Sequence, residues 1–393
     1  MGNPLTADGA ASRVRLYASS KAWIEGAALR QLEQLAARPD VVAVAGLPDL
    51  HPGLHGPVGC AALVAERVFP DIVGTDIGCG MQMHVLDLAE RRLRLEHAAE
   101  RMAALEGPWP GDARALLAEA GIEAGAAAHA LGTVGGGNHF CELQGVLEIV
   151  DGAAASRVGL EAGRLALLVH SGSRGLGAAV LARHHRDGTD GLAQADGGAA
   201  YLADHDVALR FARLNRQVIA GRALAALRAD GVEILDSPHN LVEPHAGALL
   251  HRKGAAPADR GLVPVPGSRG AVTYLVMPTA PGEALASLAH GAGRKHDRAS
   301  MAKRVETTAS GLARLARNAF GGHVVCTDRR LLVEEAPEAY KDVGRVVAEM
   351  EAAGLCRVVA VLKPLVTFKT ARIPREARAG EERSWRRERG KRR

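Results

Sequence analysis

Five side chains of the kinds that bind divalent metal ions stand beside glycine-rich turns: Asp76, Cys79, His139, His170 and His239. Asp76 and Cys79 are three residues apart in GTDIGCGM, where glycines let the backbone bend enough to bring both side chains to one point. A carboxylate, a thiolate and imidazoles together suit Mn, Fe, Co or Zn. Taken singly, this segment is more typical of a turn with a buried free cysteine. A lone histidine of this kind is likewise more often an ordinary core or surface residue. The set together predicts a metal site, and its wide spacing excludes a zinc finger.

Two glycine-rich segments, 132–138 (GTVGGGN) and 171–177 (SGSRGLG), have the composition of loops whose backbone N–H groups bind anions. Neither matches the P-loop pattern, and either one alone is typical of a simple turn. Arginines in such loops favour phosphate, because a guanidinium group matches phosphate oxygens in a fork. Those in or beside glycine-rich loops are Arg174, Arg269, Arg294 and Arg298.

His290 precedes small residues in HGAGR, which leave room for a bulky group next to its ring. A neutral imidazole is a nucleophile near pH 7 and can attack a phosphorus centre to form a phosphoramidate. From these residues alone, another metal ligand or a helix-capping histidine is the more common explanation.

The elements that must position these residues alternate along the chain. Apolar residues at helical spacing predict helices over 21–37, 90–106 and 112–130, over most of 176–228, and around a glycine-rich break in 283–319. Short apolar runs predict strands at 41–47, 165–170, 271–277 and 358–368. We therefore predict one large mixed α/β domain of the α+β class, with central sheets, flanking helices and the site in loops at strand ends.

The composition is that of a globular protein, because 47% of the 393 residues are hydrophobic and 24% are charged. The net charge of +5 comes from the end of the chain. Residues 372–393 contain nine Arg and one Lys against four Glu, which leaves a net charge of −1 for residues 1–371. We expect a catalytic domain over 1–371 and a flexible basic tail over 372–393. Because the domain has almost no net charge, any positively charged surface in it that binds nucleic acid must be local.

No apolar stretch of about 18 residues is free of charges, so we expect no membrane span. The N-terminal segment lacks the apolar core of a signal peptide. The cysteines are odd in number and widely spaced, at Cys60, Cys79, Cys141, Cys326 and Cys356. This spacing speaks against a disulfide framework and predicts a cytoplasmic location.

Six motifs, DLHPG, GTDIGCGM, GTVGGGNHF, VHSGSRG, SPHN and HGAGR, occur in an order and spacing that resembles the RtcB-type RNA ligases. The resemblance covers about residues 13–370, and the chain looks like the shorter members of that family, some of which are coupled to a release-factor-like protein. It implies a GTP- and Mn-dependent enzyme that joins an RNA 2′,3′-cyclic phosphate or 3′-phosphate end to a 5′-hydroxyl end, in RNA repair or tRNA splicing. Some family members need an archease-like activator, and the sequence leaves that requirement open.

The resemblance also implies roles for matched residues. His290 would carry GMP, Asp49 would orient His290, and the GMP would pass to the RNA 3′-phosphate before the 5′-hydroxyl displaces it. Two Mn ions would share Cys79, and their other ligands would be Asp76 and His139 for one ion, His170 and His239 for the other. The residues implied for GTP are Asn138, Glu142, His239, Asn240, Ser268, His290, Ala292, Gly293, Tyr340 and Lys369, and those implied for RNA or phosphate are Arg174 and Arg294.

Two segments depart from the family pattern: Asp297 stands where a serine is expected, and the loop 51–59 is less basic than usual. Both bear on substrate range and rate. Two other functions fit the residues, a binuclear metal-dependent phosphoesterase acting on RNA or nucleotides and a non-catalytic RNA-binding protein. A hydrolase needs no acceptor histidine beside a guanine pocket, and binding alone needs no thiolate–imidazole centre, so we predict the ligase.

Overall fold

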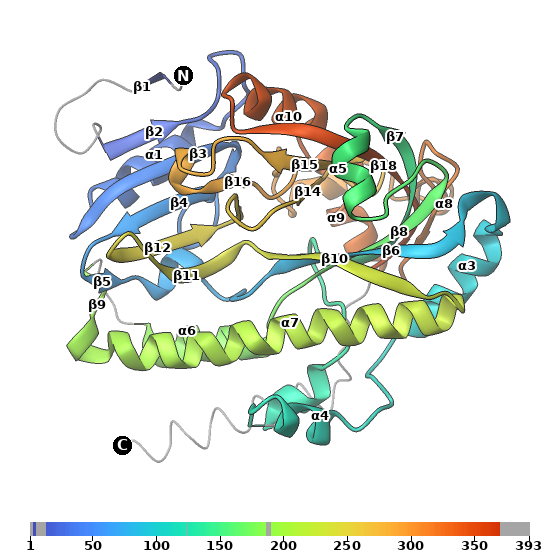
Figure 1. The fold of residues 1–393 in the computed structure, drawn as a ribbon, viewed down its shortest axis with the longest axis horizontal. Coiled ribbons are helices and arrows are strands. Elements are labelled where there is room, and N and C mark those ends of the chain that lie inside the picture. Colours follow the sequence, from blue (N-terminus) through green and yellow to red (C-terminus); the bar gives the residue numbers. More distant parts are fainter. Residues whose placement is uncertain (1–2, 5–12, 124, 186–189, 370–393) are drawn as a thin grey trace.

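Short apolar runs form the strands of two sheets in this computed structural model, which describes residues 3–4, 13–123, 125–185 and 190–369 (Figure 1). In the first sheet the strand order is β1-β2-β3-β4-β12-β11, and neighbours are antiparallel except for the parallel pair of β2 and β3. Its strands are β1 (Asn3–Pro4), β2 (Val14–Leu16), β3 (Val41–His51), β4 (Val58–Val64), β12 (Ala248–Lys253) and β11 (Asn240–His245).

The second sheet has the order β10-β6-β8-β7-β18-β15-β14, and β17 lies parallel to β18. Its strands are β10 (Gly231–Pro238), β6 (Gly80–Ala89), β8 (Arg164–Ser171), β7 (Phe140–Ile149), β18 (Cys356–Phe368), β15 (Thr273–Pro278), β14 (Val263–Pro266) and β17 (His323–Val325). The continuous apolar run of β8 follows from burial on both faces. Leu167 and Val169 face a core cluster with helix α7 (Ala199–Leu227). Ala166 and Leu168 face another cluster, with helix α5 (Gly152–Arg157).

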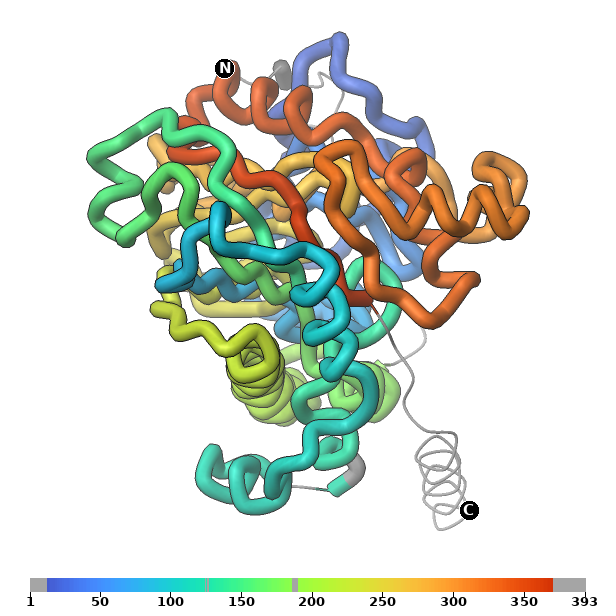
Figure 2. The backbone as a smooth tube through the Cα atoms, turned by 90° about the vertical axis from the view of Figure 1, so that its right-hand side faces the viewer, coloured from blue at the N-terminus to red at the C-terminus, as the bar shows by residue number. Residues whose placement is uncertain are grey.

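The longest described helix, α7 (Ala199–Leu227), runs along the lower side of the sheets in Figure 1 and is seen end-on in Figure 2. Its Ile219 and Ala223 belong to a cluster with β8, whereas its Phe211 packs with Leu117 of α4 (Ala113–Glu119), which lies on the far side of the helix. Apolar residues on both of these sides of α7 are therefore buried, so the helix needs no single apolar stripe.

The remaining helices and the short strand pairs connect or cover the two sheets. The helices are α1 (Gly26–Ala36), α2 (Pro70–Val73), α3 (Leu95–Met102), α5 (Gly152–Arg157), α6 (Gly175–His184), α8 (Ala309–Leu315), α9 (Arg329–Glu334) and α10 (Val343–Ala352). The single-turn elements are η2 (Glu90–Arg92), η3 (Ala103–Leu105), η4 (Ala126–Ala130), η5 (Gln194–Gly198), η6 (Glu283–Leu285), η7 (Met301–Lys303) and η8 (Pro337–Ala339). The short pairs are β13 (Ala255–Pro257) with β16 (Ser287–Ala289) and β5 (Arg67–Val68) with β9 (Leu192–Ala193).

The predicted fold class is confirmed, since sheets and helices form a single mixed α/β domain. The four predicted strands correspond to β3, β8, β15 and β18, with ends shifted by up to four residues. The helix predicted over 21–37 begins later, at Gly26. The helices predicted over 90–106, 112–130 and 176–228 are each broken into shorter elements.

The helices predicted over 283–319 are largely wrong. Residues 284, 285 and 286 have φ of +50°, +52° and +51°, which no right-handed helix contains. The apolar residues Leu288 and Ala289 lie in β16, where they join a core cluster. Only α8, near the end of this stretch, is an α-helix. In Figure 2 the orange segment that follows β16 forms a lobe at one side of the sheets.

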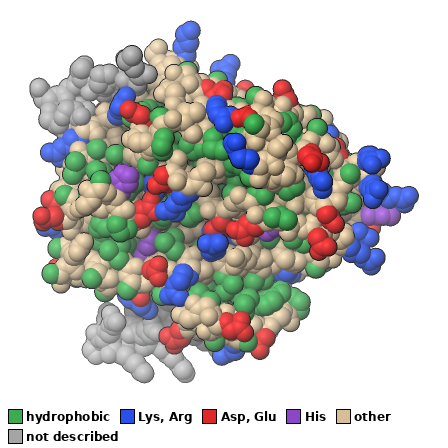
Figure 3. Space-filling view, in the orientation of Figure 1, with side chains coloured by type: hydrophobic (Ala, Val, Ile, Leu, Met, Phe, Trp, Pro, Cys, Tyr) green, Lys and Arg blue, Asp and Glu red, His purple; other side chains and the backbone are tan. Residues whose placement is uncertain are grey.

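Several sequence expectations concern the surface and the termini. Figure 3 shows Lys and Arg interspersed with Asp and Glu on one face, as expected for a domain with little net charge. None of the helices in the described part of the chain combines the length and apolar character that a membrane span requires. All five cysteines are free. The basic tail, 372–393, lies outside the described residues, and both the domain boundary and the cytoplasmic location stay predictions.

Two buried histidines hold nearby backbone segments in place by accepting hydrogen bonds from backbone N–H groups. Nε2 of His251 in β12 lies 3.0 Å from the amide nitrogen of Phe69, and Nε2 of His205 in α7 lies 3.0 Å from that of Val242. An imidazole nitrogen accepts a hydrogen bond only without its proton, so the folded state needs both rings neutral. Accordingly, burial lowers the pKa of His251 to about 3 and that of His205 to about 4.

We expect the free energy of unfolding to fall as the pH drops below about 6.5, because the unfolded chain then binds protons at these histidines that the folded chain does not. Between pH 7.5 and pH 5 each histidine accounts for a loss of about 2 kcal/mol. Urea unfolding across this range measures the loss. In His251→Gln, whose amide oxygen can accept the Phe69 N–H, the loss should shrink by about 2 kcal/mol. An unchanged pH dependence would contradict the assignment.

Candidate active site

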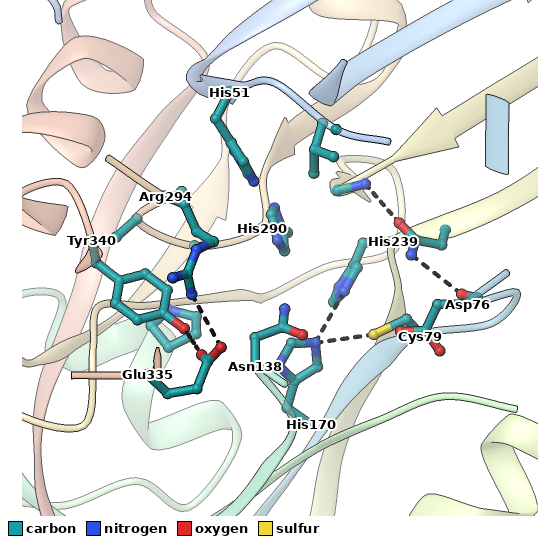
Figure 4. A pocket seen from close by; sticks show the side chains of 18 of the residues that line it. His51, Asp76, Cys79, Asn138, His170, His239, His290, Arg294, Glu335 and Tyr340 are labelled. Carbon is teal, nitrogen blue, oxygen red and sulfur yellow. Dashed lines mark hydrogen bonds and ion pairs between the residues drawn. The ribbon is translucent and has the colours of Figure 1, made fainter. Parts of the chain in front are cut away.

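A cavity of about 350 Å³ lies where strand ends and turns of both sheets meet (Figure 4). Side chains reach it from the end of β3, the turn before β6, the start of β7, the end of β8, the turn between β10 and β11, and the loop after β16. The predicted site residues that line it are Asp76, Cys79, Asn138, Glu142, His170, His239, Asn240, Ser268, His290, Ala292, Gly293, Arg294, Tyr340 and Lys369. Motifs far apart in the sequence therefore share one cavity.

The sulfur of Cys79 lies between two groups of metal-binding atoms. Figure 4 shows the group that Cys79 forms with His170 and His239. Sγ is 3.3 Å from Nε2 of His139 and 3.1 Å from Nε2 of His170. His139 Nε2 is 2.9 Å from a carboxylate oxygen of Asp76, and His170 Nε2 is 3.2 Å from Nε2 of His239. Each triad, Asp76–Cys79–His139 and Cys79–His170–His239, has its donor atoms within 4.8 Å of one another. The five predicted residues thus converge around one sulfur atom.

The protonation states fit a divalent cation. Burial holds the pKa values of His170 and His239 well below the usual range, so both rings are neutral and have a lone pair to donate. Burial and, next, the charge of Asp76 hold the pKa of the Cys79 thiol well above its usual range. A bound cation reverses this preference, because a thiolate in direct contact with it is strongly favoured. The donor set therefore suits a metal ion, and its softness favours a transition metal.

Arg216 of α7 fixes the turns that carry these ligands, and nothing in the sequence distinguishes it from other helical arginines. It is 1% exposed and makes two hydrogen bonds to the carboxylate of Asp236, at 2.6 and 2.9 Å. Its Nη1 donates to the carbonyl of Gly78 at 2.7 Å and to that of Ser171 at 3.0 Å. These carbonyls adjoin Cys79 and His170, so one buried guanidinium group ties both ligand turns together.

His290 is paired with Asp49 at the other side of the cavity. Nδ1 of His290 lies 2.8 Å from a carboxylate oxygen of Asp49, which is fully buried at the end of β3. A carboxylate only accepts, so Nδ1 carries a proton, and Nε2 is the nitrogen that can offer a lone pair to a substrate. The ring centroid of His290 is 4.7 Å from that of His239. A candidate nucleophile and the metal-binding cluster are therefore in contact.

Lys341 stabilises the segment around Asp49. Its Nζ donates to the carbonyls of Pro48, at 3.1 Å, and Leu50, at 2.7 Å. Its backbone N–H donates to the carbonyl of Gly293 at 3.0 Å. Burial lowers the pKa of Lys341 to about 8, although the charge of Asp49 opposes this effect. Nothing in the sequence marks Lys341 except that it follows Tyr340.

Gly293 allows the loop after His290 to approach Asp49. Its φ is +71°, and a Cβ atom there would overlap the backbone oxygen of Asp49. Gly354 has the same φ of +71° but open space where a Cβ would lie, which makes it a matched control.

Gly293→Ala is expected to destabilise the protein more than Gly354→Ala. The left-handed backbone alone costs about 1–2 kcal/mol in either variant. The overlap with Asp49 adds about 1–3 kcal/mol at Gly293 only. Urea unfolding of both variants measures the difference, and equal losses would show that the loop relaxes away from Asp49 without cost.

Two buried carboxylates, Glu142 and Glu335, also line the cavity. Glu142 accepts hydrogen bonds from Thr367 Oγ1 at 2.5 Å and Gln144 Nε2 at 2.7 Å, and burial raises its pKa. Glu335, which the sequence analysis missed, accepts from Arg294 Nη1 at 3.1 Å and from the hydroxyl of Tyr340. No motif marks Glu335, and its ion pair with Arg294, a residue of a distant loop, could be identified only from the structure.

Polar contacts hold most of the other predicted residues in place. Lys369 Nζ donates to the carbonyl of His139 at 2.8 Å, and burial lowers its pKa to about 8. Asn240 donates to the carbonyl of Asp76 at 3.2 Å and accepts from the N–H of Gly254 at 2.7 Å.

Three predicted residues are not among the described side chains that line the cavity: Asp49, His139 and Arg174. Asp49 and His139 contact His290 and Cys79, which do line it. Arg174 lies behind His139, with Nη1 3.4 Å from Nδ1 of that ring and Nε donating to Thr133 Oγ1 at 3.3 Å. Asp297 is exposed and caps the N–H of Ser300 at 3.0 Å.

Comparison with known proteins identifies relatives over nearly the whole chain. The family described as "tRNA-splicing ligase RtcB" matches residues 31–119 and 121–370. The chain is 41% identical to the RNA-splicing ligase RtcB2 of Escherichia coli, over 90% of this chain and 95% of that protein. It is 31% identical to the RNA-splicing ligase RtcB of Mycobacterium tuberculosis, over 86% of this chain and 100% of that protein. It is 26% identical to an RtcB homologue of Entamoeba histolytica, over 87% of this chain and 83% of that protein.

Proposed function

Because the chain belongs to the RtcB family of tRNA-splicing ligases and is an RNA ligase, we propose that it uses GTP and Mn to join RNA ends through a GMP adduct on His290. The ends are a 2′,3′-cyclic phosphate or 3′-phosphate and a 5′-hydroxyl, as in RNA repair or tRNA splicing. The observation that carries this proposal is the His290–Asp49 pair, which lies in contact with a cluster of metal-binding side chains at one cavity.

The first step uses the lone pair on Nε2 of His290. Nε2 attacks the α-phosphorus of GTP, a P–N bond forms, and pyrophosphate leaves with the electrons of the broken P–O bond. The imidazole gains positive charge, which the buried carboxylate of Asp49 stabilises through Nδ1–H, as a carboxylate does in a catalytic triad. The pairing also holds the ring in the tautomer that can attack.

Two further transfers complete the reaction. An RNA 3′-phosphate oxygen attacks the GMP phosphorus and breaks the P–N bond, which leaves RNA with an activated (3′)pp(5′)G end. The 5′-hydroxyl of the second RNA then attacks the RNA phosphorus, forms the phosphodiester bond and releases GMP. A cyclic phosphate must first be opened by water.

The two triads would hold the metal ions, Asp76, Cys79 and His139 one ion and Cys79, His170 and His239 the other. When bound, the ions stabilise negative charge that grows on phosphate and leaving-group oxygens. The thiolate shared by both triads would reduce the repulsion between two cations held close together.

The nucleotide would occupy the part of the cavity next to His290. Glu142 is suited to read the donor groups on the guanine edge, because its carboxylate can accept hydrogen bonds, and Tyr340 is suited to stack on the base. We propose that the nucleotide also contacts Asn138, His239, Asn240, Ser268, Ala292, Gly293 and Lys369, and that Arg174 and Arg294 serve the RNA or triphosphate. Support comes from the shared cavity, except for Arg174, which adjoins it behind His139.

Incubation with Mn²⁺ and GTP labelled on the α-phosphate tests the proposal. We expect an acid-labile adduct that survives denaturation and maps to the peptide containing His290. Absence of an adduct with any divalent metal would refute the proposal, and GTP-independent hydrolysis of a phosphodiester would instead favour a binuclear phosphoesterase. Multiple turnover by the purified chain would show that neither an archease-like activator nor a release-factor-like protein is required.

A further inference from the structure

His51, the last residue of β3, lines the cavity, and the proposed reaction gives it no role. The side chain is largely buried, with 9% of its surface exposed. Figure 4 shows its ring pointing into the cavity from the side opposite the metal-binding cluster, toward His290. An imidazole that faces a reaction cavity is positioned to exchange protons with whatever fills it.

The hydrogen bond of His51 determines which nitrogen faces the cavity as a base. Nδ1 lies 2.9 Å from the backbone carbonyl oxygen of Asp49. A carbonyl only accepts, so Nδ1 carries the proton, and Nε2 of the neutral ring keeps a lone pair. No described residue donates a hydrogen bond to this Nε2. Nε2 of His51 therefore faces the cavity as a hydrogen-bond acceptor. An acceptor can bind the O–H of a hydroxyl group, but not a phosphate oxygen, which is itself an acceptor.

The charged and titratable groups that face His51 are Asp49, His290 and Lys341. Burial lowers the pKa of His51 to about 4, and the charges of His290 and Lys341 add to this effect while the carbonyl and carboxylate of Asp49 oppose it. The ring is therefore neutral when the cavity is empty. Phosphate groups of bound RNA and GMP bring negative charge beside the ring, which favours protonation and makes His51 a stronger base when substrate is present.

The other cavity histidines have different tasks. His170 and His239 lie against Cys79 in one metal-binding triad, and His290 is engaged by Asp49. Two described histidines that line the cavity, His51 and His55, belong to neither the metal cluster nor the nucleotide adduct. His55 is only partly buried, in the loop between β3 and β4, and also lines a second hollow with Gln31 and Asp71. His51 is the largely buried one, with its ring directed toward His290. Some group must take the proton of the RNA 5′-hydroxyl as its oxygen bonds to phosphorus, since an uncharged alcohol is a poor nucleophile.

We propose that His51 is a catalytic residue that acts as the general base for the 5′-hydroxyl in the joining step. This inference rests on the proposed function. The proton of the 5′-hydroxyl passes to Nε2 of His51, the bond between O5′ and the RNA 3′-phosphorus forms, and the bond between that phosphorus and GMP breaks. GMP leaves with the electron pair, and His51 afterwards returns its proton to solvent.

His51→Asn separates this role from a structural one. The asparagine amide N–H can replace Nδ1–H in the hydrogen bond to Asp49, but the variant has no basic nitrogen at the position of Nε2. Enzyme carrying GMP is mixed with an RNA 3′-phosphate strand, a 5′-hydroxyl strand is added, and the adduct, the activated RNA and the joined product are followed in a single turnover. His51→Ala, which loses the hydrogen bond as well, reports the structural contribution.

In His51→Asn we expect adduct formation and RNA activation within about twofold of wild type, joining slower by about 10²–10⁴-fold, and accumulation of activated RNA. A strand ending in a 5′-thiol should lessen the joining defect at least tenfold, because a thiol needs little help from a base. Joining at the wild-type rate, or equal losses in all three steps, would overturn the inference and leave the proposed function standing. If wild-type protein forms no His290 adduct, the proposed function fails and the inference with it.

Discussion

Replacing Cys79 by alanine is expected to abolish the binding of both metal ions, whereas His139→Ala or His239→Ala should weaken only one site. The reason is the shared sulfur, which lies within 3.3 Å of His139 and 3.1 Å of His170 and belongs to both triads. Loss of a group that only supports a metal ligand typically reduces affinity 10–100-fold. Loss of the shared ligand itself should therefore reduce the affinity of each site by about 100-fold or more.

Metal analysis after dialysis against Mn²⁺ measures this directly, and Co²⁺ provides a second readout through its thiolate absorption band. We expect two ions per chain in the wild type, about one in His139→Ala or His239→Ala, and none in Cys79→Ala. Cys356→Ala is the matched control, because Cys356 is buried to a similar extent, 4% exposed against 2% for Cys79, but belongs to neither triad. Retention of two ions by Cys79→Ala, with the thiolate band lost, would mean that the sulfur does not bridge the sites.

The residues that could be predicted from the sequence are those whose type suits metal binding and whose neighbours in the sequence form a glycine-rich turn. Asp76 and Cys79 stand three apart between glycines, and His139 and His170 stand beside glycine-rich turns. These features do not depend on where the rest of the chain lies. Their convergence could not be derived from spacing, since it depends on the adjacent strands β6, β7 and β8 that bring the turns to one edge.

The residues that were missed act through tertiary contacts. Arg216 lies in the middle of a long helix, and only the packing of α7 under two turns gives it the carbonyls of Gly78 and Ser171 to bind. Glu335 gains its importance from Arg294, which is far away in sequence. His51 was within the motif DLHPG but lacked a reason to be selected until its neighbours were known.

The error over 283–319 has a different cause. A periodic pattern of apolar residues indicates which side chains can be buried together. It does not determine the backbone angles that the surrounding structure imposes on those residues. Residues 284–286 adopt φ near +50°, and Gly293 at +71° lets the chain pass close to Asp49. The same irregular backbone brings His290 to its carboxylate partner. The segment that the sequence predicts least well is therefore one on which the proposed chemistry depends most.

Asp49→Asn is expected to slow formation of the His290–GMP adduct by about 10³–10⁴-fold. The asparagine is neutral and nearly the same size, so it removes the charge that stabilises the imidazolium formed during attack. Its amide N–H can also donate to Nδ1, which moves the ring proton to Nε2 and removes the lone pair that must attack. We expect the effect in the chemical step, because Asp49 is fully buried, is not among the described residues that line the cavity, and reaches the reaction through its hydrogen bond with His290.

Single-turnover kinetics with labelled GTP separates the step from binding. The adduct-forming rate should fall, while the GTP concentration that gives half of the maximal rate should change less than about threefold, since an interaction made only in the transition state alters the rate and not the affinity. His290→Ala, which has no nucleophile, sets the background. Asp71→Asn is the control for the charge change, because Asp71 pairs with Arg38 and does not contact His290.

The fold of the variant should persist, because the hydrogen bonds that Lys341 makes to Pro48 and Leu50 use backbone carbonyls and not the carboxylate. A normal adduct rate in Asp49→Asn would mean that His290 reacts without the help of this charge. An equal loss of rate and GTP affinity would instead mean that Asp49 shapes the nucleotide pocket through the loop of Gly293. Only a rate-selective loss fits a carboxylate that stabilises positive charge on the attacking ring, because that charge exists in the transition state and not in the free enzyme.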